Sequence, residues 1–483
     1  MKKKLDAYFR IADCYYLNRD DNLLSIQYYN EALKMNTALN DKALFYLAKS
    51  YGYNGQLSEK ITTLKELLKN YSSSKYLMNA SYELARAYVS TAEYDDALTL
   101  FKSYVISYPR AINLIEARLG IADLYYKKWD YTQAELEYKK ILDEFEKVRD
   151  ICEKAVKGLV DVYVAQKYPE KASDIADKYS CANISKDEKE NLFYNPALES
   201  YMDSSYSEAV IKFSAYLTKF PNGRFVNETF YFLGNSYYKT KDTLNAINYF
   251  EKFLETPNNI YSESAASRTA YYYYSKQNHL LATKYYEKLD QLASKPATIF
   301  SAKLGLMRCH FLSGDFIKSV IYSKLVLETA GISNQQKIEG EYSKGMSNYN
   351  LMNFEEAKVS LEWLVKNTTT AIGSESKYTL ATINFKQEKY GQADIEIKSL
   401  LKMKPAYNYW VAKGLILQAR IMIINEDLFQ AEQTLKSVLD FYPDQSDGVI
   451  SESNELWNEL MLIKNPVIEE VQEEIKTIEI KEE

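Results

Sequence analysis

The chain has 483 residues, of which 46% are hydrophobic, so it is long enough to bury a substantial core. Only 15 glycines and 9 prolines are present, and this scarcity of turn-forming residues favours long helices. The net charge of −6 at pH 7 gives no excess of lysine and arginine, which argues against a nucleic-acid-binding protein. The longest apolar stretches, such as GLILQARIMII from Gly414, are interrupted by Gln and Arg before they reach the length of a transmembrane helix.

The first residues, MKKKLDAYFRIADCYY, start with three lysines but contain no continuous apolar region, because Asp6, Arg10 and Asp13 interrupt it. The chain as written is therefore not expected to carry an export signal. Residues 5–17 already have the pattern of a repeat helix, with no polar cap before them. We expect either that the chain is the C-terminal part of a longer array or that its true start lies upstream.

One pattern repeats along the chain, and it is clearest in ELARAYVSTAEYDDALTLF from Glu83, GIADLYYKKWDYTQAELEY from Gly120 and FLGNSYYKTKDTLNAINYF from Phe232. A small residue is followed by Tyr three places on and by Ala twelve places on, and an aromatic residue comes four places after that Ala. The twelve-residue step recurs in twelve units to about residue 445. The paired positions, the first pair with one inserted residue, are Ala12/Ser25, Ala48/Lys60, Ala85/Ala97, Ala122/Ala134, Val160/Ala172, Ala197/Ala209, Gly234/Ala246, Ala270/Ala282, Met307/Ser319, Gly345/Ala357, Ala381/Ala393 and Ala419/Ala431.

This spacing predicts a helical hairpin whose two helices cross closely at the small residues, where a Leu would overpack the crossing by about 1–3 kcal/mol. The aromatic residues fill the space beside the crossing and contribute about 2–3 kcal/mol each when buried. Because one hairpin cannot bury its outer face, successive hairpins stack and share a continuous core. The predicted fold is all-α: an α–α superhelical solenoid of about twelve helical hairpins.

The small, aromatic and Ala positions, with closing prolines at Pro109, Pro221, Pro405 and Pro443, resemble the tetratricopeptide repeat (TPR). The longer repeats that end in aromatic-Pro, as in SYPRAINLIEARLGIADLYY and KFPNGRFVNETFYFLGNSYY, are similar to envelope proteins of Gram-negative bacteria. Examples are the lipoprotein of the outer-membrane barrel assembly machine and the periplasmic partner of the Tol system. The resemblance covers several repeats and implies a non-catalytic scaffold for partner proteins, associated with the periplasm or the outer membrane.

Differences between the repeats predict five segments. The fifth unit has a short second helix, followed by a charged stretch, 185–191, that we interpret as a linker at a bend. In the last four units the Tyr three places after the small residue becomes His310, Asn348, Asn384 or Met422. The segments are an N-terminal array (1–181), a central array (182–300), a divergent C-terminal array (301–445), a capping helix (446–464) and an acidic flexible tail (465–483).

The sequence offers no constellation for catalysis or cofactor binding. The two histidines, His279 and His310, lie too far apart in a linear array to form a metal site or a Ser/His/Asp triad. The motifs GxxxxGK[ST], GxGxxG, HExxH and CxxC do not occur. We therefore expect no enzymatic activity, no metal and no cofactor in this chain.

Four cysteines are scattered along the chain, and their default interpretation is that they are small buried hydrophobic residues. One pair supports a sharper hypothesis. In an antiparallel hairpin that crosses at Val160 and Ala172, the residue opposite Cys152 lies near position 180, next to Cys181. A disulfide between Cys152 and Cys181 is geometrically feasible and would be worth about 3–4 kcal/mol.

In the TPR family the first helix of each hairpin lines a concave groove, into which the residues three before and one and four after the small residue point. Aromatic residues occupy many of these positions here. A tyrosine-lined groove suits an extended peptide or a helix of a partner protein, because Tyr combines rigid area with a polar tip. The alternative is that many of these rings pack between adjacent first helices. The candidate groove residues are Tyr82, Tyr126, Tyr194, Tyr231, Tyr238, Tyr271, Tyr274, Tyr342, Tyr349 and Tyr378, with Phe385 at an equivalent position.

The run TAYYYYSKQNH from Thr269 cannot form one aromatic face, because consecutive residues of a helix point about 100° apart. We expect Tyr273 to be buried in the core and Tyr272 to pack against a second helix. Tyr271 and Tyr274 are then the two rings that face the groove.

Lys49 and Arg86 follow the small residue in adjacent repeats, as in the clamp with which some TPR proteins hold a C-terminal carboxylate. Asp123 and Asp161 occupy the same position in the next two repeats, so the basic cluster does not continue. The leading hypothesis is a scaffold in the bacterial envelope that binds protein partners. The alternatives are a cytoplasmic adaptor, which the absence of a signal favours, and the non-catalytic part of a larger protein with a missing N-terminal domain. The sequence does not indicate an oligomeric state.

Overall fold

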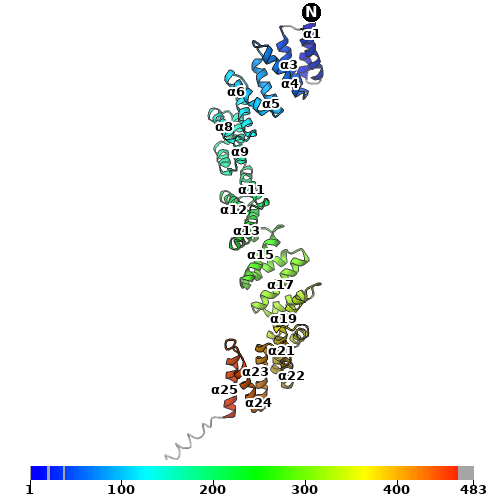
Figure 1. Ribbon diagram of the computed structural model, residues 1–483, viewed down its shortest axis with the longest axis vertical. Coiled ribbons are helices and arrows are strands. Elements are labelled where there is room, and N and C mark those ends of the chain that lie inside the picture. Colours follow the sequence, from blue (N-terminus) through cyan, green and yellow to red (C-terminus); the bar gives the residue numbers. More distant parts are fainter. Residues whose placement is uncertain (1, 19–21, 36–37, 466–483) are drawn as a thin grey trace, which may run out of the picture. The chain divides into compact units, whose positions relative to one another are not determined.

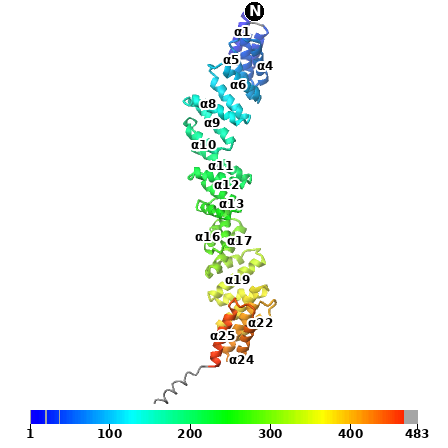
Figure 2. The same ribbon diagram turned by 60° about the vertical axis from the view of Figure 1, so that its left-hand side comes forward.

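The computed structural model describes residues 2–18, 22–35 and 38–465. These residues form 25 α-helices and one short 3-10 helix, and no strand occurs among them. The chain divides into two compact units, Met1–Lys241 and Asp242–Glu483. Figures 1 and 2 follow the helices in chain order from blue to red. The predicted acidic tail, apart from Asn465, lies outside the described residues, and the division of the array at 181 and 300 remains a prediction.

The first unit consists of consecutive helices joined by short turns. Its helices are α1 (Lys2–Asn18), α2 (Asn22–Leu33), α3 (Asn40–Tyr53), α4 (Leu57–Asn70), α5 (Leu77–Ser90), α6 (Tyr94–Ser107), α7 (Leu114–Lys127), α8 (Tyr131–Phe145), α9 (Arg149–Ala165), α10 (Pro169–Lys178), the 3-10 helix η1 (Ser180–Ala182), α11 (Lys186–Met202), α12 (Tyr206–Lys219) and α13 (Val226–Lys239). Each helix packs on the next one along the chain. In the first 24 helices, odd-numbered α-helices correspond to the predicted first helices and even-numbered ones to the second helices.

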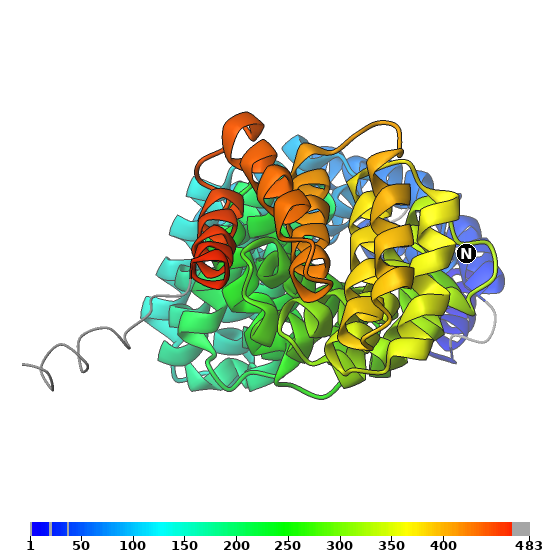
Figure 3. The ribbon, with the colours of Figure 1, turned by 90° about the horizontal axis from the view of Figure 1, so that it is seen from below.

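The second unit continues the same alternation. Its helices are α14 (Thr243–Leu254), α15 (Ser262–Ser275), α16 (His279–Leu292), α17 (Pro296–Leu312), α18 (Phe316–Leu327), α19 (Asn334–Asn350), α20 (Phe354–Asn367), α21 (Ala371–Lys386), α22 (Tyr390–Leu401), α23 (Asn408–Ile424), α24 (Leu428–Phe441) and α25 (Val449–Lys464). Helix α25 packs on α23 and α24, and Figure 3 shows it in red beside these orange helices. The all-α solenoid confirms the predicted fold class.

The paired small residues are buried within the hairpins, in line with the prediction that the helices pack there. Every one of the 24 paired positions is buried except Lys60. The lysine is accommodated because its partner helix carries Gly52, where even a Cβ would approach the Lys60 stem to 3.0 Å. The Lys60 ammonium reaches Glu83 on the next first helix, with an N–O distance of 2.6 Å. An ion pair thus replaces a small residue at this crossing.

The turn inside each hairpin has the same backbone conformation in many repeats. Ala92, Trp129, Lys167 and Ser204 all adopt a φ close to 60°. In the turn at Ala92, the backbone N–H of Glu93 donates to the carbonyl of Tyr88 over 2.9 Å, which closes the end of the first helix in a Schellman-type motif. A left-handed residue costs a non-glycine side chain about 1–2 kcal/mol, so hydrogen bonding and packing of the two helices must offset this strain.

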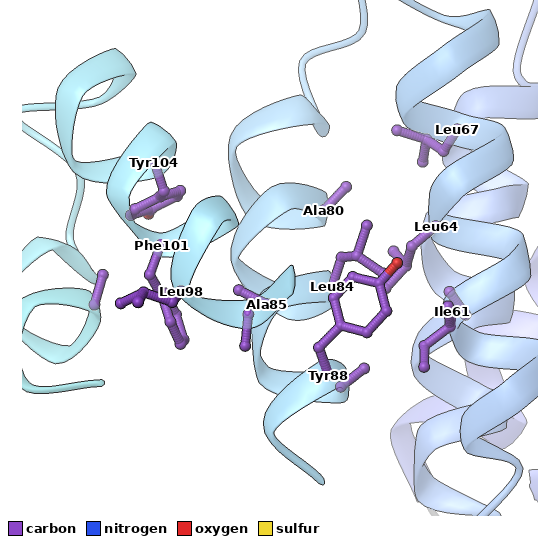
Figure 4. Packing of buried hydrophobic residues seen from close by; sticks show 14 of the residues in the cluster. Ile61, Leu64, Leu67, Ala80, Leu84, Ala85, Tyr88, Leu98, Phe101 and Tyr104 are labelled. Carbon is purple, nitrogen blue, oxygen red and sulfur yellow. The ribbon is translucent and has the colours of Figure 1, made fainter. Parts of the chain in front are cut away.

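The core is continuous between neighbouring hairpins. Figure 4 shows Ile61 and Leu64 of α4 on the side of α5 that carries Leu84 and Tyr88, while Phe101 belongs to α6 on the other side of α5. In six of the twelve repeats the residue four places after the second small residue is an aromatic residue of the core. Tyr29, Phe101, Tyr138, Phe213, Phe250 and Tyr286 are all buried.

The charged stretch 185–191 is not a linker, in contrast to the prediction. Ser185 caps helix α11, which starts at Lys186 and contains the rest of the stretch. The Ser185 side chain accepts a hydrogen bond from the backbone N–H of Glu188, and the Glu188 carboxylate accepts one from the N–H of Ser185. This capping box explains why so polar a sequence is helical. Helix α10, by contrast, is short as expected.

His310 occupies a core position in the second unit, as predicted from its place in the helix. It is buried, its ring stacks on Tyr322 with centroids 5.5 Å apart, and its Nδ1 lies 3.2 Å from the Asp315 carboxylate. Burial lowers the pKa of His310, and Lys318 acts in the same direction, while Asp315 and Glu287 oppose the shift. His310 is therefore neutral in the folded chain at neutral pH.

The lowered pKa predicts a pH dependence of stability. Below the ordinary value of 6.5 the unfolded chain binds a proton at His310 that the folded chain does not, so the free energy of unfolding falls as the pH is lowered. We expect wild type to lose more stability between pH 7.5 and pH 5.5 than His310→Phe, when both are unfolded in urea. Leu280→Ala is the control, because Leu280 is exposed and carries no titratable group, and it should keep the wild-type dependence. Identical pH profiles for wild type and His310→Phe would contradict the assignment.

Candidate functional site

A series of hollows follows the first helices of the first unit. Four hollows of about 550, 400, 420 and 380 Å³ are lined by residues of α1, α3, α5, α7 and α9, with some from α4, α6 and α8. Neighbouring hollows share wall residues: the first two share Lys49 and Glu83, the next two share Arg86 and Ser90, and the last two share Asp123. We call these connected hollows the first-unit groove.

The N-terminal end of the groove combines aromatic rings with polar groups. Tyr16 and Tyr46 meet edge to face with centroids 5.3 Å apart, and Phe45 and Tyr82 complete the aromatic lining. Within the same hollow, Lys42 binds Asp13 with an N–O distance of 2.9 Å. This end therefore offers flat ring surface between polar groups, which suits contact with side chains of a peptide.

The other end of the groove contains two carboxylates with weakened acidity. Asp123 accepts a hydrogen bond from the buried Tyr138 hydroxyl, and no ion pair involves Asp123 or Asp161 in the described part of the chain. Burial raises the pKa of Asp123, against the hydrogen bond from Tyr138 and the charge of Lys127. Burial and then the charge of Asp123 raise the pKa of Asp161. Water reaches both carboxylates from the groove, but the surrounding helices limit their solvation.

Two of the ten candidate tyrosines line the hollows of the first unit. Tyr82 borders the 550 and 420 Å³ hollows, and Tyr126 borders the 380 Å³ hollow. Groove rings that the sequence analysis missed include Tyr16, Phe45, Tyr46 and Tyr53, and Phe45 lies three residues before Ala48, at a position that the pattern assigns to the groove. Tyr16 lies four residues after Ala12 in the irregular first repeat, and Tyr46 lies two residues before Ala48, a position outside the pattern.

Two other candidates are core residues, and the prediction for them is corrected. Tyr194 and Tyr231 are 6% and 8% exposed. Tyr194 stacks on Phe225 with centroids only 4.1 Å apart, because the loop before α13 folds back over α11. Tyr231 packs edge to face on Phe232, with centroids 5.6 Å apart. Both rings are therefore buried in the packing of the chain and do not line a groove.

The remaining candidates lie on first helices at the boundary between core and solvent. Tyr238 and Tyr271 are exposed, whereas Tyr274, Tyr342, Tyr349 and Tyr378 are half-buried. The half-buried rings are already engaged within the chain: Tyr274 lies 6.0 Å from the Arg308 guanidinium, Tyr342 donates to Glu375 over 3.1 Å, Tyr349 lies 4.8 Å from the Lys386 ammonium, and Tyr378 packs on Trp410 at 5.5 Å. Phe385 is half-buried against Tyr390.

The four tyrosines of TAYYYYSKQNH have separate roles, but Tyr273 is not buried as expected. It is half-buried, since its ring stacks on Tyr285 while its hydroxyl extends to Glu251 and donates a hydrogen bond of 2.9 Å. Tyr285 donates to the same carboxylate oxygen. Tyr272 packs edge to face on Tyr273, and Tyr271 is the exposed member of the run.

Gly158 keeps the Tyr138 ring in place beside the groove. A Cβ at Gly158 would overlap this buried ring, which holds Asp123. We expect Gly158→Ala to lower the free energy of unfolding by about 1–3 kcal/mol, since the ring must leave its rotamer or the helices must separate. Gly391→Ala is the control, because nothing lies within 4 Å of its Cβ, and it should stabilise the chain by up to about 1 kcal/mol. If Gly158→Ala and Gly391→Ala changed the free energy of urea unfolding equally, the contact between Gly158 and the Tyr138 ring would not be tight.

The described residues contain no helix that is both long enough and apolar enough to cross a bilayer. Within the same residues, no three His, Cys, Asp or Glu side chains gather as they would around a metal ion.

Residues 42–74 and 82–148 match families of tetratricopeptide repeats, and residues 186–274 match the family described as outer membrane lipoprotein, YfiO. No curated protein matches the chain by sequence. Among solved structures, a tetratricopeptide repeat protein from Parabacteroides merdae ATCC 43184 is 14% identical, with 62% of this chain and 97% of that chain covered and a TM-score of 0.29. Yeast Tom70 is 14% identical, with 92% and 99% covered and a TM-score of 0.32.

The chain is therefore a tetratricopeptide repeat solenoid, a scaffold of the kind that binds proteins. Over residues 186–274 it resembles outer membrane lipoproteins of the YfiO type.

Proposed function

We propose that this chain binds a segment of a partner protein, either an extended peptide or a helix, in the first-unit groove. The observation that supports this is the continuity of the groove: four connected hollows run along five successive first helices. A continuous groove suits a linear segment better than a small compact ligand. The rings of Tyr16, Tyr46, Tyr82 and Tyr126 provide rigid contact area along it. The exposed rings of Tyr238 and Tyr271 are further candidates for contact.

We also propose that the scaffold works in the bacterial cell envelope. The match of residues 186–274 to outer membrane lipoproteins supports this location. A second support is the disulfide between Cys152 and Cys181, whose Cα atoms lie 6.0 Å apart. Disulfides form and persist in oxidising compartments such as the periplasm, and they are rare in the cytosol.

The groove can be tested by photo-crosslinking in cells that express the native gene. A benzophenone amino acid would replace Tyr82 or Tyr126 in the groove, and Thr99 or Leu136 on the outer face of second helices as controls. We expect both groove positions to crosslink to the same protein and the outer positions not to do so. Crosslinks to a shared protein from the outer positions alone would contradict the proposed site. Fractionation of the same cells tests the location, and recovery in the cytosol would contradict the envelope assignment without affecting the groove.

A further inference from the structure

The first-unit groove contains four charges in a fixed order. Lys49 of α3, Arg86 of α5, Asp123 of α7 and Asp161 of α9 each occupy the position directly after the first small residue of their repeat. Each of them lines at least one of the connected hollows. Because successive first helices present the same position to the groove, the four side chains form a row of two cations followed by two anions. We call this row the charge row.

No member of the charge row forms an ion pair in the described residues, whereas several neighbouring groove charges do; Glu116, Lys127 and Lys154, which also line the hollows, are likewise without an ion pair there. Lys42 is paired with Asp13, Lys60 with Glu83, and Lys157 with Glu153. In the described residues, no carboxylate lies within 4.0 Å of the Lys49 ammonium or the Arg86 guanidinium. Both cations lie near aromatic rings, and Lys49 also interacts with the Tyr16 hydroxyl and, at longer range, with the charge of Glu83. The Lys49 ammonium lies 5.7 Å from the Tyr16 ring, and the Arg86 guanidinium lies 5.9 Å from the Tyr82 ring.

The two anions are likewise not paired with cations. Asp123 is bonded to a neutral hydroxyl, that of Tyr138, and the charge of Asp123 acts unfavourably on Asp161. Lys127 and Lys154 border the same hollows, but neither forms an ion pair with the two carboxylates in the described part of the chain. A positive group placed between Asp123 and Asp161 would relieve their repulsion and compensate for their limited solvation.

We infer that the partner segment carries acidic side chains that contact Lys49 and Arg86, followed along the segment by basic side chains that contact Asp123 and Asp161. This inference rests on the proposed binding of a segment in the groove. First helices of successive repeats lie about 10 Å apart, so a segment in the extended polyproline II conformation, which rises about 3.1 Å per residue, advances by about three residues per repeat and keeps every third side chain on the groove side. The segment would therefore have two acidic residues and then two basic residues, spaced about three residues apart, and either end of the segment could lead. Such complementarity selects partners by excluding wrong charge patterns.

Four labelled peptides test this inference by fluorescence anisotropy with the full chain. Each has four charged positions three residues apart in one background of Leu, Tyr and Ser, with the charges ordered Glu-Glu-Lys-Lys, Glu-Lys-Glu-Lys, all Glu or all Lys. The first two have the same composition and net charge. We expect wild type to bind the segregated peptide about tenfold more tightly than the alternating one at low salt, and expect this preference to shrink as salt is added.

Charge reversals within the row should switch the preference. Lys49→Glu with Arg86→Glu makes the row wholly acidic, and this variant should prefer the all-Lys peptide. Asp123→Lys with Asp161→Lys makes the row wholly basic and should prefer the all-Glu peptide. Lys69→Glu with Arg110→Glu is the matched control for the first variant, because it changes the net charge equally at exposed positions outside the groove. It should keep the wild-type order.

The possible failures are distinguishable. Two outcomes would overturn this inference but not the proposed use of the groove. One is that wild type binds the segregated and alternating peptides with affinities within twofold of each other. The other is that a charge-reversed variant with wild-type circular dichroism and melting keeps the wild-type order of peptides. Absence of binding to all four peptides would overturn both this inference and the proposed use of the groove. Gain of a new preference in the reversed variants cannot result from misfolding, so that outcome supports the charge row directly.

Discussion

Replacement of both Cys152 and Cys181 by alanine is expected to lower the free energy of unfolding by about 3–4 kcal/mol. The disulfide joins residues 29 positions apart, from the first half of α9 to η1, and so restricts the unfolded chain. Helix α10 has only ten residues, and the disulfide also links the segment that follows it to the core around Tyr179 and Ala182. A short helix contributes little packing of its own, so the crosslink supplies a large part of the stability of this region.

Urea unfolding of the full chain, followed by circular dichroism, measures this loss. Hydrogen exchange should place the loss in α9, α10 and η1. Cys14→Ala is the control, because Cys14 is an exposed free cysteine and its replacement should be neutral. The disulfide itself is tested by counting thiols in denaturant without reductant. Two free thiols are expected, those of Cys14 and Cys309, whereas four would contradict the pairing.

The repeat pattern could be found in the sequence because its determinants are local. A small residue at each helix crossing is favoured within a single hairpin, so a step of twelve residues, thirteen in the first repeat, predicts the paired positions, including the unusual one at Lys60. The same antiparallel geometry predicted that Cys152 and Cys181 lie close together. What the chain needs in order to form one hairpin is therefore present within about 35 consecutive residues, a repeat length that the sequence shows directly.

The division of tyrosines between groove and core could not be predicted in the same way. It depends on contacts between repeats and on loops outside the repeat pattern. Tyr194 is buried because Phe225, in the loop after α12, stacks on it. That loop is held by the buried Glu190, whose carboxylate accepts a hydrogen bond of 2.9 Å from the Arg224 N–H. The spacing of small residues does not predict that this loop folds back over α11, so the position of Tyr194 in its repeat did not predict its burial.

Charge raises a similar difficulty. From the sequence, Lys49 and Arg86 resembled the beginning of a basic cluster that Asp123 and Asp161 then interrupted. The structure adds that some groove charges are neutralised by neighbours, as in the Lys60–Glu83 pair, while these four form no ion pair in the described residues. Pairing depends on residues in adjacent helices, and only the folded arrangement separates a charge that stabilises the fold from one that is free to contact a partner.

Phe213→Ala is expected to lower the free energy of unfolding by about 3–5 kcal/mol, one of the largest effects of a single substitution in this chain. Phe213 is fully buried in α12, stacks on Phe232 with centroids 5.7 Å apart, and contacts Tyr194 at 5.9 Å. It thus connects the hairpin of α11 and α12 to α13, and its removal leaves a cavity between large rings that cannot easily move together. The cost should exceed that of Tyr273→Ala, because Tyr273 is only half-buried and Tyr285 would still bind Glu251.

Ile211→Ala provides the control within the same helix, since Ile211 is 69% exposed two residues earlier, and its replacement should change stability by less than about 0.5 kcal/mol. Urea unfolding of the three variants, with hydrogen exchange at α12 and α13, measures the order. A loss for Phe213→Ala no greater than that for Tyr273→Ala would mean that the second-helix aromatic is not the main core residue of the repeat. The expected order would mean that the residue four places after the second small position stabilises the contact between neighbouring hairpins. The half-buried and exposed tyrosines of the first helices then contribute less to stability and are available to contact a partner.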